Sequence, residues 1–366
     1  EVDADTTYHY TLEIEFVETN ADQNHNENKE FSGRVIVEFS GEYLRDTILA
    51  DNPTIDNSRS GEITGPLTEN TTGTLFTAED DDGTSYVYAG DVDNNWVSFA
   101  GFYWRIIRIN GDGSIRMIYS GDSESGPAET GEGTQIGTSA FNEQYNDNAY
   151  VGYMYGSTGA SSYSATHANI NDSTIKRVLD EWYQQNLLSY SNYISRDAGF
   201  CSDRSVNATD EVWWESDTKL GYGTNVTAYG PWARLYQNGQ ENNQIPTLKC
   251  NQSNNDLYTM SNASRGNKEL MYPIGLITSD ESVIMGAFRG IDNVSYYLYT
   301  GQNYWTISPY RFDGSSSGIF TISSGGMVGD NFPPAKYGVR PVINLDKNVT
   351  ISSGDGTIDN PYVIET

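Results

Sequence analysis

Alternating apolar and polar residues near the start of the chain predict β-strands. In "TTYHYTLEIEF", residues 6–16, apolar and polar side chains fall on opposite faces of an extended chain. The run "GRVIVEFSG", residues 33–41, alternates in the same way after a polar loop. A lone pair of strands is only marginally stable in water, so we expect residues 1–50 to form a β arm that docks elsewhere. Either the chain's own body or, as we favour, a neighbouring subunit covers its apolar face, which consists of Tyr8, Tyr10, Leu12, Ile14 and Phe16.

The rest of the chain alternates short apolar runs with polar, glycine-rich segments. Residues 51–73 are predicted to be a linker by composition, and residues 74–366 a loop-rich β body. Within the body, "NGDGS" at 110–114 supplies the turn residues of a hairpin. Residues 120–170 are expected as surface loops and 200–270 as a loop-rich insertion. The predicted strands are "TSYVYAGD", "NWVSFAGFYWRIIRIN", "SIRMIYSG", "PIGLITSDE", "YYLYTG", "YWTISPY", "GIFTISSGG", "GVRPVINL" and "PYVIET".

One segment has clear helical periodicity. "NDSTIKRVLDEWYQQNLL", residues 171–188, predicts an amphipathic helix capped by Asn171 or Ser173. A short helix is also compatible with "GEYLRDTILAD". The chain shows no βαβ rhythm, so a doubly wound parallel fold is not expected. The predicted class is mainly β with one amphipathic helix, an α+β fold; its core-facing positions in the helix are Ile175, Val178, Leu179, Trp182 and Leu187.

The charge of the chain excludes several partners. Its 366 residues include 50 acidic and 21 basic ones, for a formal net charge of −29. Such a surface repels nucleic acids and anionic membranes. No run of about 18 apolar residues predicts a membrane-spanning segment. The chain begins at Glu1 without a signal segment, as expected for a secreted protein after processing, although a shortened chain would look the same.

Cys201 and Cys250 are the only cysteines, and their spacing fits no zinc, haem or redox motif. We expect one disulfide in an oxidising compartment, with two buried thiols as the alternative. Eight sequons are compatible with an N-glycosylated exterior, although Asn, Ser and Thr are common enough for most to occur by chance. They begin at Asn70, Asn171, Asn207, Asn225, Asn251, Asn262, Asn293 and Asn348.

The sequence contains no recognisable catalytic set. Its three histidines are His9, His25 and His167, and it has no GxSxG, HExxH, Walker or GxGxxG motif. We therefore expect no enzyme and no organic cofactor. Pairs of catalytic carboxylates remain open, because acidic residues occur throughout the chain.

Two acidic loops, "AEDDDG" at residues 78–83 and "DVDNN" at residues 91–95, are candidate calcium sites. "DVDNN", residues 91–95, resembles the start of a calcium loop, but Trp96 and Phe102 stand where an EF-hand needs Gly and Glu. A solvated acidic turn is the simpler interpretation, and a weak extracellular calcium site is the alternative. Its candidate ligands are Asp80, Asp82, Asp91 and Asp93.

An ordered set of motifs carries a family resemblance over about residues 60–366. The motifs are "FAGFYWRIIRINGDGSIRMIY", "FCSDRSV", "YPIGLITSDE", "YLYTGQNYWTISPY", "YGVRPVINL" and "GDGTIDNPYVI". Together they resemble a widespread group of secreted, surface-displayed proteins of Gram-positive bacteria, which implies an extracellular or cell-surface location. More distantly, the ending resembles the C-terminal half of C-type-lectin-like domains, including the formylglycine-generating-enzyme branch. That likeness implies a C-type-lectin-like body in which a strand carrying "VRPV" closes a small twisted sheet.

The resemblance bears on Arg340 and on the cysteines. In such folds the equivalent arginine is a buried organiser of loop carbonyls and carboxylates, a task that suits its planar fork. We expect Arg340 to be structural, with a ligand-facing role as the alternative. Formylglycine-type chemistry needs reactive cysteines, whereas Cys201 and Cys250 lie in polar loops that favour a disulfide.

Two functions remain. The first is a structural subunit of an extracellular filament or pilus, a homopolymer assembled by strand complementation between neighbouring copies. The second is a lectin-like surface adhesin that binds host or matrix glycans without polymerising. Its candidate glycan-binding aromatics are Trp213, Trp214 and Trp232, for which core packing is the simpler interpretation.

Overall fold

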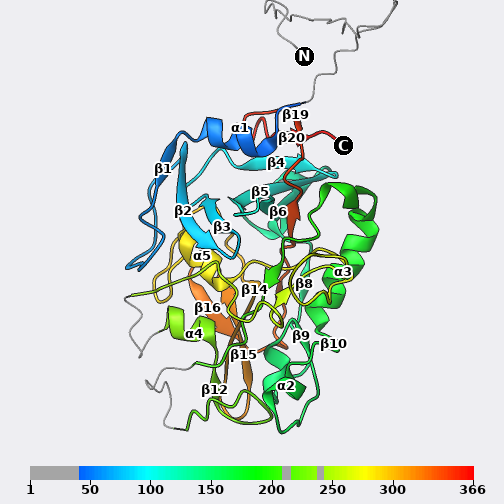
Figure 1. Cartoon of the computed structure of the whole chain (residues 1–366). Coiled ribbons are helices and arrows are strands. Elements are labelled where there is room, and N and C mark those ends of the chain that lie inside the picture. Colours follow the sequence, from blue (N-terminus) through cyan, green and yellow to red (C-terminus); the bar gives the residue numbers. More distant parts are fainter. Residues whose placement is uncertain (1–40, 208–215, 237–242) are drawn as a thin grey trace, which may run out of the picture. The chain divides into compact units, whose positions relative to one another are not determined.

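The computed structural model describes residues 41–207, 216–236 and 243–366 (Figure 1). The chain divides into two compact units, Glu1–Ser40 and Gly41–Thr366, and the second is described below. The expected interface face from Tyr8 to Phe16 lies outside the described residues, as do Trp213 and Trp214.

The segment expected as a linker is part of the second unit. Strand β1 (Thr54–Asp56) pairs in parallel with β2 (Thr74–Asp80). The Arg59 guanidinium donates to the carbonyl oxygens of Val283 and Ile284, both at 2.5 Å. Residues 51–73 therefore pack against the body instead of connecting two independent parts.

The larger sheet of the described residues has ten strands in the order β1-β2-β3-β5-β4-β20-β19, with β6 joining β5 to β18 and β7. All neighbours are antiparallel except β1 with β2 and β20 with β4. The remaining bounds are β3 (Gly83–Val87), β4 (Trp96–Phe99), β5 (Phe102–Ile109), β6 (Ile115–Asp122), β7 (Gly126–Pro127), β18 (Val342–Leu345), β19 (Ile351–Ser353) and β20 (Tyr362–Ile364).

A second sheet contains six strands of the described part, in the order β16-β15-β14-β17-β8, with β12 beside β14. Its strands are β8 (Thr138–Ser139), β12 (Thr227–Ala228), β14 (Tyr304–Phe312), β15 (Ser317–Ile322), β16 (Val328–Asn331) and β17 (Tyr337–Gly338). Two small ribbons pair β9 (Met154–Tyr155) with β10 (Asn171–Asp172), and β11 (Phe200–Cys201) with β13 (Leu257–Tyr258).

The predicted class, mainly β in an α+β fold, is confirmed, but the described residues contain more helix than expected. The α-helices are α1 (Leu44–Asp51), α2 (Tyr163–Thr166), α3 (Thr174–Asn186), α4 (Gly230–Leu235) and α5 (Ser279–Met285). Short 3-10 turns occur at Glu132–Thr134, Asn148–Val151 and Leu188–Tyr193.

Helix α3 is the amphipathic helix that the sequence predicts, and Ser173 is its N-cap, since its hydroxyl accepts from the amide of Lys176. The partly buried Trp182 ring lies 5.0 Å from Phe102 and 6.0 Å from Tyr119, measured between ring centroids. The helix therefore packs on the hairpin of β5 and β6, and its apolar face is core, as its spacing predicted.

Four strand or loop predictions were wrong. "PIGLITSDE" runs into helix α5, because Thr278 and Glu281 form a capping box that begins the helix. "YYLYTG" forms turns, and "NWVSFAGFYWRIIRIN" is two strands joined at Ala100 and Gly101, which have φ values of 56° and 79°. The segment 120–170 is not only surface loop, because it places Phe141, Val151 and Tyr153 in the core.

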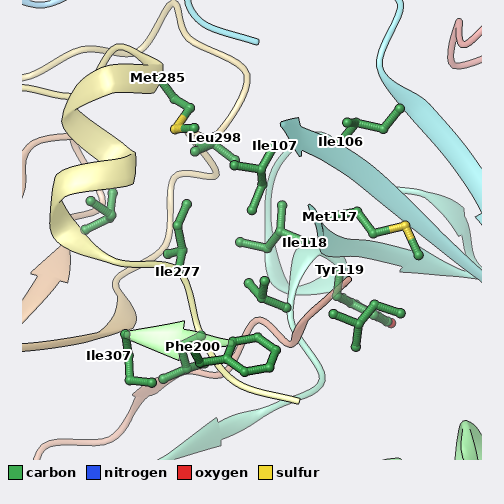
Figure 2. Packing of buried hydrophobic residues seen from close by; sticks show 14 of the residues in the cluster. Ile106, Ile107, Met117, Ile118, Tyr119, Phe200, Ile277, Met285, Leu298 and Ile307 are labelled. Atoms are coloured by element: carbon green, nitrogen blue, oxygen red, sulfur yellow. The ribbon is translucent and has the colours of Figure 1, made fainter. Parts of the chain in front are cut away.

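The hydrophobic core joins the two sheets through α5. Figure 2 shows Ile107 of β5 and Ile118 of β6 pointing toward Met285 and Leu298, while Ile106 and Met117 point to the opposite side. In Figure 1, α5 (yellow) lies between the larger sheet and strands β14–β16 (orange), and it contacts all three of those strands. The core thus holds α5 in a fixed position against β5 and β6, which positions the charged residues described next.

The predicted hairpin turn at 110–114 is confirmed, since the amide of Gly113 donates to the carbonyl of Asn110 at 2.8 Å. Gly111 packs so tightly that an added Cβ would lie 2.5 Å from Oδ1 of Asp80. Within the described ranges, no helix is long and apolar enough to cross a bilayer.

Candidate functional site

Cys201 and Cys250 form the predicted disulfide, with Cα atoms 5.7 Å apart. The bond is typical of proteins in oxidising compartments. The amide of Cys250 donates to a carboxylate oxygen of Asp81 at 3.0 Å, which ties the disulfide to the turn between β2 and β3. Both cysteines also line a cavity that is rich in charged residues.

A β-bulge at Ile107 determines which residue of β6 lies opposite Arg108. Ile106 opposes Met117 and Arg108 opposes Arg116, so Ile107 is the extra residue of β5. The bulge places two arginines directly opposite each other on one face, a like-charge pair that would be unfavourable alone. Glu281 compensates, with Oε1 lying 2.6 Å from Arg116 Nε and 3.4 Å from Arg108 Nη2.

Glu281 also begins helix α5. Its Oε2 accepts from the amide of Thr278 at 2.8 Å and from Arg116 Nη2 at 3.2 Å. The residue is 1% exposed, and burial alone would raise the pKa of its carboxyl group. The positive charges of Arg116 and Arg108 and the amide of Thr278 outweigh that effect and lower the pKa of Glu281. Glu281 is thus held as an anion.

The neighbouring Asp280 forms an ion pair with another arginine, Arg234. Arg234 of α4 donates from Nε to Asp280 at 2.6 Å and from Nη1 to Asp203 at 2.8 Å. Thr247 also donates its amide to Asp280, at 3.0 Å. Both carboxylates of this group are therefore paired with a cation.

These groups line the charged cavity, which we define by five basic and five acidic residues and which has a volume of ≈ 50 Å³. In a chain with only 21 basic residues, five lie around this one cavity. Gly199 and the two cysteines of the disulfide also line it. The charged residues are Asp80, Asp81, Arg108, Arg116, Asp203, Arg234, Lys249, Arg265, Asp280 and Glu281.

Arg108 differs from the other members of the charged cavity. It is 9% exposed, and its Nε and Nη1 atoms are buried without a hydrogen-bond partner in the described residues. Among the described residues, its one ion pair is the 3.4 Å contact with Glu281. Buried guanidinium donors normally have acceptors, so the N–H groups of these two nitrogens are available to donate to a ligand.

Arg340 is a buried residue whose guanidinium joins three separate parts of the chain. It donates to the carbonyl oxygens of Tyr119, Thr134 and Leu298 at 3.1–3.3 Å. It also stacks over the ring of Tyr304, with Cζ 5.0 Å from the ring centroid, and it is 1% exposed. It also donates to the hydroxyl of Ser120 at 3.3 Å, and the described residues show no carboxylate hydrogen-bonded to it.

Several expected surface sites are not on the surface. Trp232 is 1% exposed, because Pro231 begins helix α4 and the indole packs in the core, so it presents no face to a glycan. Asn207 and Asn293 are 3% and 2% exposed, which excludes these two sequons as glycosylation sites in the folded protein. The side-chain amide of Asn293 donates to the carbonyl oxygens of Leu67 and Gly286. Five sequon asparagines are exposed and Asn225 is partly so; the exposed ones are Asn70, Asn171, Asn251, Asn262 and Asn348.

The candidate calcium ligands are separated by their structural roles. The Asp80 carboxylate accepts from the Gly111 amide at 2.8 Å and from Ser85 at 2.7 Å, which joins two hairpin turns. Asp82 pairs with Arg265 at 2.6 Å, whereas Asp91 and Asp93 are exposed. Within the part of the chain that the structure describes, no group of three or more His, Cys, Asp or Glu side chains is placed to hold a metal ion.

An apolar groove lies at the end of β16, in the second sheet. It has a volume of ≈ 480 Å³ and is lined by Tyr145, Ser316, Asn331, Phe332, Pro334 and Ala335. Tyr145 and Phe332 are 45% and 49% exposed. The amide of Asn331 is already bonded to the hydroxyl of Tyr337 and its side-chain oxygen to the amide of Phe332. The groove thus offers mainly apolar contact.

Comparison with known proteins gives no relative. No protein-family model matches the chain, no curated protein matches it, and no solved structure matches it. The resemblances to surface proteins of Gram-positive bacteria and to C-type-lectin-like domains therefore stay predictions.

The charged cavity could not have been found from sequence spacing alone. Arg108 and Glu281 are far apart in sequence, and a bulge brings Arg108 to the correct face. One signal was present, because Thr278 and Glu281 have the spacing of a capping box and predict that a helix begins there.

Proposed function

We propose that this protein is a structural subunit of an extracellular filament or pilus, in which the N-terminal arm of one copy docks on the body of the next. The observation that carries the proposal is the apolar groove at the end of β16, a surface that suits an apolar strand face. The disulfide supports a location outside the reducing cytoplasm.

The arm supplies the matching surface by its sequence. Its alternating run places five large apolar side chains on one face, from Tyr8 to Phe16. Burial of that face at about 25 cal/mol per Å² contributes on the order of 10 kcal/mol before the cost of ordering the arm. Division of the chain into units 1–40 and 41–366 is compatible with an arm that acts separately from the body.

Strand β16 is a suitable neighbour for such an arm. It is an end strand, pairing with β15 along one side and bridging Arg289 only at Val328 among the described residues. Its free edge is short, and the ion pair of Asp330 with Arg289 at 2.9 Å limits unspecific pairing. We therefore place the arm's strand along β16, with its apolar side chains in the apolar groove.

This contact joins two different surfaces, so it does not close on itself and continues into a fibre. The net charge of −29 opposes lateral clumping of such fibres. The alternative, an adhesin that binds glycans without polymerising, is less well supported by the described aromatics, since Trp232 is buried.

Electron microscopy and light scattering of the full chain test the proposal. Filaments should form with the unchanged chain and be lost in Leu12→Asp and Phe332→Asp, which place a charge in the arm face and in the groove. The matched controls are Thr11→Asp, on the polar face of the arm, and Val294→Asp, at a residue that is 61% exposed outside the groove. Both controls should still polymerise.

A full-length chain that stays monomeric at high concentration, with its arm protected from protease, would contradict the filament. The adhesin would then be the better hypothesis, and a glycan array would examine it.

A further inference from the structure

We propose that the charged cavity binds the carboxylate group of a small, hydroxyl-rich acid, and that Arg108 is the residue that binds it. The charged cavity shares no lining residue with the apolar groove, and the inference does not rest on the filament.

Among the four arginines that line the cavity, Arg108 has the longest ion-pair contact in the described residues, at 3.4 Å. Asp280 and Asp203 pair with Arg234, and Glu281 pairs most closely with Arg116 at 2.6 Å. Arg265 pairs with Asp82 at 2.6 Å. Arg108 keeps two buried nitrogens without acceptors in the described structure.

An anion satisfies this arginine better than a neutral group. A buried donor without a partner costs roughly 1–3 kcal/mol, and more when the group is charged. Hydrogen bonds between ionised partners are about twice as strong as neutral ones, and arginine is well suited to carboxylates. Glu281 and Asp280 are already paired with Arg116 and Arg234, while the carboxylates of Asp80 and Asp81 accept from the backbone amides of Gly111 and Cys250. An external carboxylate can therefore supply the acceptors that Arg108 lacks.

The dimensions of the site limit the ligand. A cavity of ≈ 50 Å³ holds about three to five water-sized groups at about 10–15 Å³ each, the size of a carboxylate with its attached carbon. An outer basin of ≈ 480 Å³ shares Asp81, Leu257 and Arg265 with the cavity. That volume is in the range of small-molecule sites. Ser253, Asn254 and Ser264 line the basin, which favours a ligand body rich in hydroxyl groups.

Isothermal titration calorimetry of the full chain with four probes tests the inference. The probes are D-glucuronate, acetate, D-glucose and inorganic phosphate, each titrated at one fixed ionic strength. We expect saturable heat with glucuronate, weaker binding of acetate because it leaves the basin empty, and no binding of glucose. Glucuronate should also raise the urea midpoint of unfolding, because a ligand that binds only the folded chain stabilises it.

Two substitutions identify the binding residue. Arg108→Gln should weaken glucuronate binding by at least about tenfold. Arg108→Lys, which keeps the charge but loses the fork, should weaken it less and serves if the first variant does not fold. The matched control is Arg45→Gln, an exposed arginine that is ion-paired to its neighbour Asp46 and should bind as the unchanged chain does.

Three results would overturn the inference. They are the absence of saturable heat with either carboxylate, binding of phosphate without binding of carboxylates, and binding that Arg108→Gln and Arg108→Lys leave unchanged.

Discussion

Arg340 and Arg108 are both at least nine-tenths buried, yet their surroundings differ in one respect. Arg340 donates to three backbone carbonyls and stacks on Tyr304, so its charge is fully used in joining loops. Arg108 has a 3.4 Å contact with Glu281, and two of its nitrogens have no hydrogen-bond partner in the part of the chain that the structure describes. The difference shows that burial of an arginine does not by itself distinguish a structural residue from a binding residue, whereas the number of its unused donors does.

The largest expected effect on stability concerns the disulfide of Cys201 and Cys250, which lines the charged cavity together with Arg108. Replacing both cysteines, Cys201→Ala with Cys250→Ala, should lower the free energy of unfolding by about 4 kcal/mol, since the bond closes a loop of 49 residues. Urea unfolding measures the loss. Reductant should destabilise the unchanged chain and leave the double variant unaffected. Alkylation of two thiols in the untreated, unreduced protein would show that the bond does not form.

Arg340→Gln should have the next largest effect. The substitution leaves up to three buried carbonyl oxygens, those of Tyr119, Thr134 and Leu298, without their donor. At roughly 1 kcal/mol or more for each unsatisfied acceptor, we expect a loss of about 3 kcal/mol in the free energy of unfolding. A loss near zero in urea unfolding would mean that Arg340 does not organise these loops.

The imidazole ring of His167 has one nitrogen with a hydrogen-bond partner, as in Arg340, and one buried nitrogen without a partner among the described residues, as in Arg108. Its Nε2 lies 2.8 Å from the carbonyl oxygen of Gly221, whereas Nδ1 is buried without a partner in the described residues. Burial, followed by the positive charge of Arg204, holds the pKa of His167 well below 6.5. The folded protein therefore keeps the ring neutral, while the unfolded chain takes up a proton as the pH falls below about 6.5.

The stability contributed by His167 is thus present above about pH 6.5 and decreases below it, by roughly 1.4 kcal/mol for each pH unit. Urea unfolding at about pH 7, 6 and 5 measures this loss. His167→Gln keeps a donor for Gly221 and should remove this part of the pH dependence. His9 and His25 are the same in both proteins, so the comparison cancels any contribution they make. Identical slopes would contradict the pKa shift.

Arg108→Gln should have the smallest effect on stability, less than about 1 kcal/mol, although it is the same substitution as in Arg340→Gln. The lost attraction to Glu281 is offset by removal of a buried charge with unused donors. Glu281 keeps Arg116 at 2.6 Å and the amide of Thr278. Urea unfolding of the two variants side by side measures the contrast, and equal losses would remove the distinction between the two arginines.

Residue patterns alone determined much of the described architecture. The alternation of strands, the positive-φ turn at 110–114 and the periodicity of α3 are local properties, so the mainly β α+β class and the Ser173 cap could be predicted. The disulfide followed from the presence of only two cysteines. The resemblance to C-type-lectin-like domains implied a buried Arg340, and this residue is 1% exposed.

The tertiary structure alone decided which charges meet. The bulge at Ile107 turns Arg108 toward Glu281, and strand periodicity does not reveal such an insertion. Whether Trp232 or Asn293 is buried depends on contacts with distant segments, as does the partition of Arg116, Arg234 and Arg265 among the acids. Local sequence specifies the backbone hydrogen bonds of a turn or helix, but the partners of a long side chain are fixed only when sheets and helices pack, because those partners come from far along the chain.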